Sequence, residues 1–240
     1  MSEQFNKAID VVSEILKAPH RVIFVDTCSI LNLINSTHQR ALSEKYISET
    51  IELMSLQSNG QVWLIASEIV YKEWHDNIDQ VISTAKNAFK DIQRNSKIYM
   101  HLSNLLLGTT LQNLDHNLFE RIENQLRNIS SNFLFSCKLL SRETEHQLKS
   151  CNRVYQCIAP SKMGKDSYKD CEIFECFYDF SMQLRNSGFQ EKIVFFTYNT
   201  EDYGKESAPF GQLEQDFQQI DAELVTNIGH VLAIANRKCG

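Results

Sequence analysis

Short apolar runs that alternate with helical patterns limit the fold of this chain more than any other feature. Residues 21–25, 61–66 and 192–197 each have the length and apolar content of one buried strand, and each ends in polar residues. Residues 222–225 are a candidate for a fourth strand. Because helical patterns separate these runs, the strands should pair in parallel, with helices packed on the sheet. The sequence therefore predicts an α/β fold with a central parallel sheet.

Helical segments are indicated by apolar residues that recur at intervals of three and four positions. Such a pattern covers about residues 3–17 before Pro19 stops it, and further helices are expected at about residues 39–56 and 230–236. Between about residues 78 and 155 there is no convincing strand, and the helical spacing continues in Leu102, Leu105, Leu106 and in Leu118, Ile122, Leu126, Ile129. We predict a helical insertion there, within a single domain that spans residues 1–240.

Composition excludes several classes of protein. The formal net charge of -6 argues against a broad basic surface, so contact with nucleic acid should be local or assisted by a metal ion. The seven cysteines are an odd number without a CxxC pair, which favours reduced, structural thiols over disulfides or a zinc site. No apolar run approaches the roughly 18 residues of a membrane span, and the N-terminus is unlike a signal peptide. We expect a cytoplasmic protein without a membrane partner.

Acidic and amide side chains follow the predicted strands. Asp26 comes directly after the first strand, and Asn199 and Asp202 come after the third. Glu73 lies about two helical turns beyond the exit of the second strand, and Asp170 falls in the opening turn of a later helix. Because ligands of open α/β sheets bind outside the carboxyl ends of the strands, these side chains should converge on one edge.

A cluster of carboxylates drawn from distant segments suits a hard divalent cation. Mg²⁺ and Mn²⁺ are held by one or two carboxylates and keep water and phosphate oxygens as their remaining ligands. Such an ion can activate a bound water and stabilise the leaving oxygen of a phosphodiester, so no nucleophilic side chain is required. The expected cofactor is therefore Mg²⁺ or Mn²⁺.

Four segments, taken in order, resemble the motifs of PIN domains. They are VIFVDTCSILNL, SEIVYKE, KDCEIFE and FFTYNTEDYG, which together span residues 22–203. With Arg153 and Pro160 ahead of the third motif, the chain is most similar to enlarged bacterial PIN-like proteins that carry a helical insertion. The resemblance implies a three-layer α/β/α fold and a metal-dependent nuclease, with RNA favoured over DNA.

The resemblance also implies roles for individual residues. Asp26, Glu73 and Asp170 match the metal-binding acids of the family, and Asp202 matches a later acid of the last motif. Asn199 stands where many members have a further Asp, a departure that leaves the number of metal ions and the activity open. Asp202 or Glu175 can complete the site, so the expected catalytic set is Asp26, Glu73, Asp170, Glu175, Asn199 and Asp202.

Basic and aromatic residues near these acids have two interpretations. Arg153, Lys162 and Lys165 could bind the substrate phosphates, whereas a solvated loop is an equally good explanation of the lysines. Asp26 could act only as a helix cap, and Glu73 could lie on a solvated helix face. We expect Phe174, Phe177, Tyr178 and Phe180 to belong to the core, His75 to be structural, and Tyr198 and Tyr203 to be candidates for substrate contact.

The function best supported by the sequence is a metal-dependent endonuclease that cuts RNA. The first alternative is a catalytically weak PIN-like module that binds nucleic acid or a regulatory protein, with Asn199 as the mark of lost metal affinity. The second is a phosphatase of small esters, against which the absence of a DxDxT motif after Val25 weighs. A homodimer or a regulatory partner protein is left open.

Overall fold

The computed structural model describes residues 5–35, 44–111, 118–165 and 167–237. Its central sheet has five strands in the order β3-β2-β1-β4-β7, and all neighbours are parallel. The strands are β1 (Val22–Val25), β2 (Trp63–Ser67), β3 (Lys138–Leu140), β4 (Ile193–Phe196) and β7 (Ala222–Val225). The predicted parallel sheet is therefore confirmed, and the four strands read from the sequence are present.

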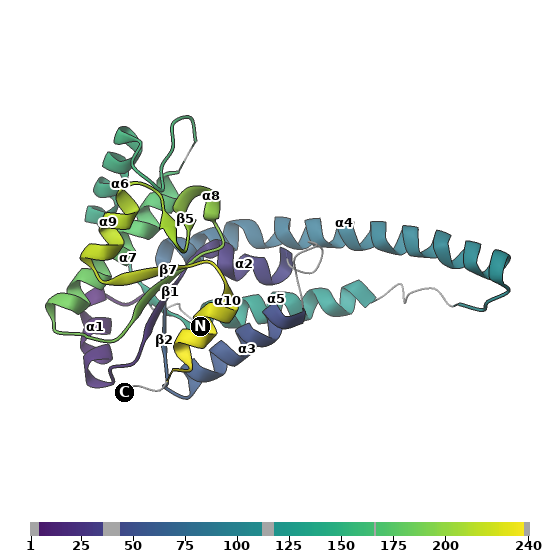
Figure 1. Cartoon of the computed structure of the whole chain (residues 1–240), viewed down its shortest axis with the longest axis horizontal. Coiled ribbons are helices and arrows are strands. Elements are labelled where there is room, and N and C mark those ends of the chain that lie inside the picture. The colour runs from purple at the N-terminus through teal and green to yellow at the C-terminus, as the bar shows by residue number, and fades with distance from the viewer. Residues whose placement is uncertain (1–4, 36–43, 112–117, 166, 238–240) are drawn as a thin grey trace.

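Helices cover both faces of the sheet and give three layers, α/β/α (Figure 1). One group contains α2 (Thr27–Asn35), α3 (Glu44–Ser58), α4 (Glu68–Leu107), α5 (Leu118–Ser136) and α10 (Ile228–Ala235). The other contains α1 (Ala8–Lys17), α6 (Thr144–Gln156) and α7 (Tyr168–Asn186), while α9 (Gln212–Gln219) packs on β7. The short helix α8 (Thr200–Tyr203) and a hairpin of β5 (Gly204–Lys205) and β6 (Ala208–Pro209) follow β4.

The segment predicted to be a helical insertion is helical, but it also contains a strand. β3 forms the edge of the sheet beside β2, so the expectation that residues 78–155 lack a strand is wrong. Its three residues are too few to show an alternating or continuous apolar pattern. The predicted helix at about 39–56 is present as α3 from Glu44 onward, and residues 39–43 lie outside the described part of the chain.

Helix α4 is unusually long. Its 40 residues correspond to about 60 Å, and the last of its buried side chains is Ala85. Beyond that point α4 reaches away from the sheet, and the first part of α5 returns beside it (Figure 1). Among the residues that the structure describes, no helix is both long enough and apolar enough to cross a membrane.

The central strands β1 and β4 are apolar throughout because both faces of the sheet are covered. Every residue of β1 and β4 is buried. An aromatic cluster of α7, α9 and the central strands fills one face, with ring centroids of Phe177 4.8 Å from Phe195, 5.5 Å from Phe24 and 5.7 Å from Phe217. Phe174 and Phe180 are buried beside it, as expected for core residues.

The order of the strands also defines where a ligand can bind. β1 is flanked by β2 on one side and β4 on the other, so the chain leaves β1 and β4 in opposite directions. At such a switch point the loops diverge and leave a crevice outside the carboxyl ends of the strands. Asp26 follows β1 at this crevice, and Thr197 follows β4.

Replacement of Phe177 by Ala should lower the free energy of unfolding by about 3–5 kcal/mol, because this ring is 0% exposed and its loss leaves a cavity. Urea denaturation of the wild type and the variant measures this difference. Tyr155→Ala is the matched control, since Tyr155 is 88% exposed, and its effect should stay within about 0.5 kcal/mol. Equal losses in the two variants would show that the cluster is not the core.

Candidate active site at the strand ends

Asp26 is fixed between the ends of the two central strands. Its Oδ1 accepts a hydrogen bond from the backbone N–H of Thr27 at 2.7 Å. Its Oδ2 accepts one from the Thr197 hydroxyl at 2.7 Å and one from the Cys28 thiol at 3.0 Å. The residue is only 2% exposed. Asp26 therefore contacts the start of α2, but it also joins the ends of β1 and β4, which a helix cap would not require.

Glu73 reaches the same place from α4. Ser67 caps this helix by accepting a hydrogen bond from the Val70 N–H at 3.4 Å, which sets the direction of its first turns. Two turns later, the Glu73 Oε2 atom accepts a hydrogen bond from the Thr27 hydroxyl at 2.7 Å. Thr27 thus contacts both acids, one through its backbone and one through its side chain.

Asn199 connects the remaining two acids. It is the N-cap of α8, where its Oδ1 accepts a hydrogen bond from the Asp202 backbone N–H at 3.3 Å. Its amide group donates to Asp202 Oδ2 at 2.7 Å and to Asp170 Oδ1 at 3.4 Å. Because an amide both donates and accepts, Asn199 holds Asp170 and Asp202 together where a further carboxylate would repel them.

Burial and the charges of the neighbouring acids shift the pKa values of this cluster. Burial, and then the charges of Asp26, Asp202 and Glu73, raise the pKa of Asp170 to about 7. Burial likewise raises the pKa of Asp26 and of Glu73, despite their hydrogen bonds. Like charges that are buried together destabilise each other, so this cluster favours proton uptake or a bound cation.

Asp202 differs from the other three because two lysines neutralise it. Burial alone would raise its pKa, but hydrogen bonds from Lys165 and Asn199 and the lysine charges lower it below its usual range. Lys165 Nζ forms an ion pair with Asp202 Oδ2, and Lys162 Nζ lies 3.3 Å from Oδ1. Asp202 itself is 0% exposed.

Two residues expected at this site are engaged elsewhere. The guanidinium of Arg153 is bound to Glu175 and to Asp216, with 2.7 Å between Arg153 Nη2 and Asp216 Oδ2, and its Nη1 donates to the Ala159 carbonyl at 2.7 Å. Arg153, Glu175 and Asp216 are all buried. The expectation that Arg153 binds phosphate does not fit this geometry, because its donors are occupied. Glu175 neutralises Arg153 and makes no contact with Asp170 that would complete the cluster.

The neighbouring aromatic residues make contacts within the protein. Tyr203 is fully buried and its hydroxyl donates to the Asp170 carbonyl at 3.0 Å, so substrate contact by Tyr203 is excluded. Tyr198 packs edge-on against Tyr46 with ring centroids 5.3 Å apart and accepts from the Ile228 N–H. His75 is exposed, and its ring packs edge-on against Tyr71 and Trp74.

A profile of the PIN domain matches residues 23–203 of the chain. The chain belongs to the PIN-domain family. Neither the curated proteins nor the solved structures contain a match. PIN domains are nucleases in general and use divalent metal ions. The question for this chain is whether its strand-end acids could hold such an ion.

The acids of this PIN domain offer the type of ligand that a hard divalent cation needs. In the part of the chain that the structure describes, no three of them have ligand atoms all within 4.8 Å of one another, so they would have to close up around an ion. Oxygen ligands from Asp26, Glu73, Asp170 and Asp202 are the donors that Mg²⁺ and Mn²⁺ prefer. Asp202 Oδ1 is buried and makes no hydrogen bond, although Lys162 is near it. The Lys162 ammonium group, 3.3 Å from this oxygen, already compensates its charge, so a metal ion at Asp202 would compete with the lysine.

Sequence reasoning missed the side chains that orient the acids of the PIN domain. Thr27, Cys28 and Thr197 all contact Asp26, Thr27 also contacts Glu73, and the Tyr198 backbone N–H donates to the Cys28 sulfur at 3.2 Å. The sequence does show short polar residues directly after β1 and β4. It does not show which of them contact one another, because those contacts form only when β1 pairs with β4.

Replacement of Asp170 by Asn should stabilise the metal-free protein at pH 8 by on the order of 1–2 kcal/mol. In the folded protein the pKa of Asp170 is raised from the usual 3.8 to about 7. Asp170 therefore lowers the free energy of unfolding as the pH rises between these two values. The gain in the variant should shrink toward pH 4. Urea denaturation in EDTA measures it, with Asp10→Asn as an exposed control. A variant less stable than wild type at pH 8 would contradict the assignment.

Proposed function

We propose that this PIN domain is a metal-dependent endonuclease that hydrolyses phosphodiester bonds in RNA in the cytoplasm. The observation that carries the proposal is the convergence of Asp26, Glu73, Asp170 and Asp202 at the switch point of the sheet, with the pKa of Asp170 raised to about 7. Structural ion pairs do not explain this arrangement, because three of the four acids have a raised pKa.

Asp26, Glu73, Asp170 and Asp202 would hold Mg²⁺ or Mn²⁺. When bound, such an ion lowers the pKa of a coordinated water and stabilises the leaving oxygen of the phosphodiester. The chain supplies no nucleophilic side chain of its own at this site, since burial and Asp26 raise the pKa of the Cys28 thiol well above its usual range. Cys28 therefore remains protonated and acts as a hydrogen-bond donor to Asp26.

The chain contributes the orientation of the ligands. Thr197, Cys28 and the Thr27 N–H determine the position of the Asp26 carboxylate, and the Thr27 hydroxyl determines that of Glu73. Asn199 is a positioning residue, because it acts through Asp170 and Asp202. Outer partners of this kind commonly change metal affinity or activity by about 10–100-fold when they are removed.

Lys162 and Lys165 are the candidates for substrate contact. Their ammonium groups lie on Asp202 at the border of the acidic cluster, and their side chains are 43% and 45% exposed. A phosphate next to the acids would have these cations within reach, which suits a substrate that the protein's net negative charge otherwise repels. The same arrangement limits binding to a few phosphates.

A second candidate function is a binding or regulatory module of the PIN type. Asn199 favours it, because an amide replaces a charged ligand at the end of β4 and two lysines already neutralise Asp202. Weak metal affinity would leave a pocket that binds nucleic acid without cutting it. The two functions differ in one respect: a nuclease cuts RNA in a reaction that requires the acids, whereas a binding module binds RNA without cutting it.

Cleavage of labelled RNA in Mn²⁺ or Mg²⁺ should fall roughly 100-fold or more in Asp26→Asn and in Asp170→Asn, because direct ligands matter at least as much as their outer partners. EDTA should abolish it, and labelled DNA and a generic phosphomonoester should be poorer substrates. Asp10→Asn is the control for the change from acid to amide.

The binding-module function would be supported if folded wild-type protein retained RNA but cut neither polymer in any of the metals. Hydrolysis of the phosphomonoester without cleavage of either polymer would support a phosphatase. Metal-dependent cleavage that persists unchanged in both Asn variants would contradict the proposed site.

Removal of Lys162 and Lys165 should weaken binding of a nuclease-resistant RNA oligonucleotide and reduce the slope of log affinity against log salt by about one for each lysine that contacts a phosphate. Fluorescence anisotropy between 50 and 200 mM salt, a range of about fourfold, gives both quantities. Lys17→Ala on α1 is the control. An unchanged slope in the double variant would exclude these lysines from phosphate contact.

A further inference from the structure

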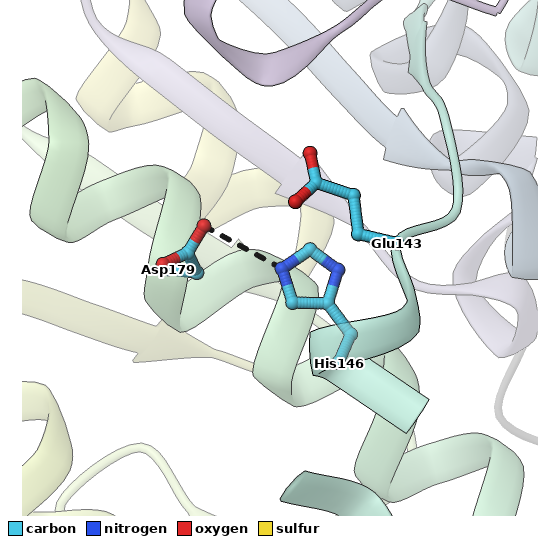
Figure 2. Close-up of side chains that lie close together, drawn as sticks. All are labelled: Glu143, His146 and Asp179. Carbon is cyan, nitrogen blue, oxygen red and sulfur yellow. Dashed lines mark hydrogen bonds and ion pairs between the residues drawn. The ribbon is translucent and has the colours of Figure 1, made fainter. Parts of the chain in front are cut away.

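A second group of metal-ligating side chains lies between α6 and α7. It consists of Glu143, His146 and Asp179, whose ligand atoms all lie within 4.8 Å of one another (Figure 2). Glu143 and His146 come from the start of α6, and Asp179 comes from α7. Figure 2 shows the three side chains grouped together, with a dashed line from the imidazole to Asp179 and the Glu143 carboxylate on another side of the ring.

The Glu143 carboxylate has no structural task in this arrangement. Glu143 occupies the N-cap position of α6, but its side chain makes no capping hydrogen bond. Among the residues that the structure describes, it also forms no ion pair. Glutamate is not among the residues that usually cap a helix through the side chain, so the carboxylate is available for another contact. Here the half-buried carboxylate lies beside the His146 ring instead.

His146 and Asp179 are held in place by other contacts. His146 is 3% exposed, and its Nε2 lies 3.5 Å from Asp179 Oδ2, which is long for a hydrogen bond. Gln183 donates to the same Asp179 oxygen at 2.7 Å and so orients the carboxylate. Metal ligands are commonly oriented by such outer partners.

This group is separate from the acids at the strand ends. Asp179 follows Asp170 by nine residues on α7, which places it about 13–14 Å further along the helix axis and about half a turn around it. A cation bound by one group would not contact the other. The inference is therefore independent of the proposed nuclease function.

We propose that Glu143, His146 and Asp179 bind a divalent transition-metal ion, such as Mn²⁺ or Zn²⁺, that joins the start of α6 to the middle of α7. One imidazole nitrogen and two carboxylates suit these ions, whereas Mg²⁺ prefers oxygen ligands alone. Bonds of about 2.0–2.2 Å place neighbouring ligand atoms about 3.0–3.5 Å apart, so a group whose atoms lie within 4.8 Å of one another would have to close up by up to about 1–2 Å.

A simple ion pair between His146 and Asp179 is the alternative. It explains the lowered pKa of Asp179, for which the His146 hydrogen bond is the first cause, but it leaves Glu143 without a role. The charge of Lys149 also helps to lower the pKa of Asp179, but its ammonium group is ion-paired with Glu145 at 3.0 Å rather than with Glu143. Two carboxylates around one imidazole retain a negative charge that a divalent ion would neutralise.

Isothermal titration with MnCl₂ tests the proposal in the full chain carrying Asp26→Asn and Asp170→Asn, which disables the strand-end group. Mn²⁺ is the main probe because Zn²⁺ also binds thiols, and Cys151 and Cys157 are exposed. We expect one equivalent of Mn²⁺ to bind and to raise the melting temperature. Glu143→Gln should weaken binding at least about tenfold while it preserves the fold.

His146→Ala should abolish binding, and His101→Ala on the exposed surface of α4 should leave it unchanged. Since His146 is buried, Glu143→Gln decides the result if His146→Ala fails to fold. Absence of Mn²⁺ binding in the parent protein would overturn the proposal, as would Glu143→Gln protein that binds like its parent. Cleavage of RNA is not a readout, so loss of the nuclease proposal would leave this result intact.

Discussion

The hydrogen bond from the Thr197 hydroxyl to the buried Asp26 carboxylate joins the ends of β1 and β4, and the rest of the site depends on it. It holds a charge at the point where the two central strands diverge, and Thr27 then links that charge to Glu73 on α4. The pairing of β1 with β4 therefore converts residues some 170 positions apart into one polar network. A parallel sheet covered on both faces supplies the rigidity that such a network needs.

The acids at the strand ends repel one another, and two features of the chain reduce this repulsion. Lys162 and Lys165 neutralise Asp202 directly. Asp170 instead keeps a raised pKa, so part of the cluster carries less negative charge near neutral pH in the absence of a cation. The protein thus combines acids that favour a cation with lysines that favour a phosphate, and both are elements of phosphodiester hydrolysis.

Much of the fold, and the location of several candidate site residues at the strand ends, could be predicted because the central strands are continuous apolar runs followed by polar residues. The run before Asp26 and the run before Thr197 are examples. The edge strand β3 could not be predicted, because three residues are too few to show the apolar pattern of a strand. The role of Arg153 was also hidden, because its partners Glu175 and Asp216 come from α7 and α9 and meet only after the helices pack. Sequence distance carries no information about such pairing.

The central claim is that the strand-end acids form a divalent-cation site. Anomalous diffraction from a crystal soaked in Mn²⁺ tests it most directly. The account predicts a peak about 2.0–2.2 Å from carboxylate oxygens of Asp26 and Asp170, with Glu73 or Asp202 nearby. A well-ordered crystal whose acids keep their present hydrogen bonds, without a peak among them at high Mn²⁺, would contradict it.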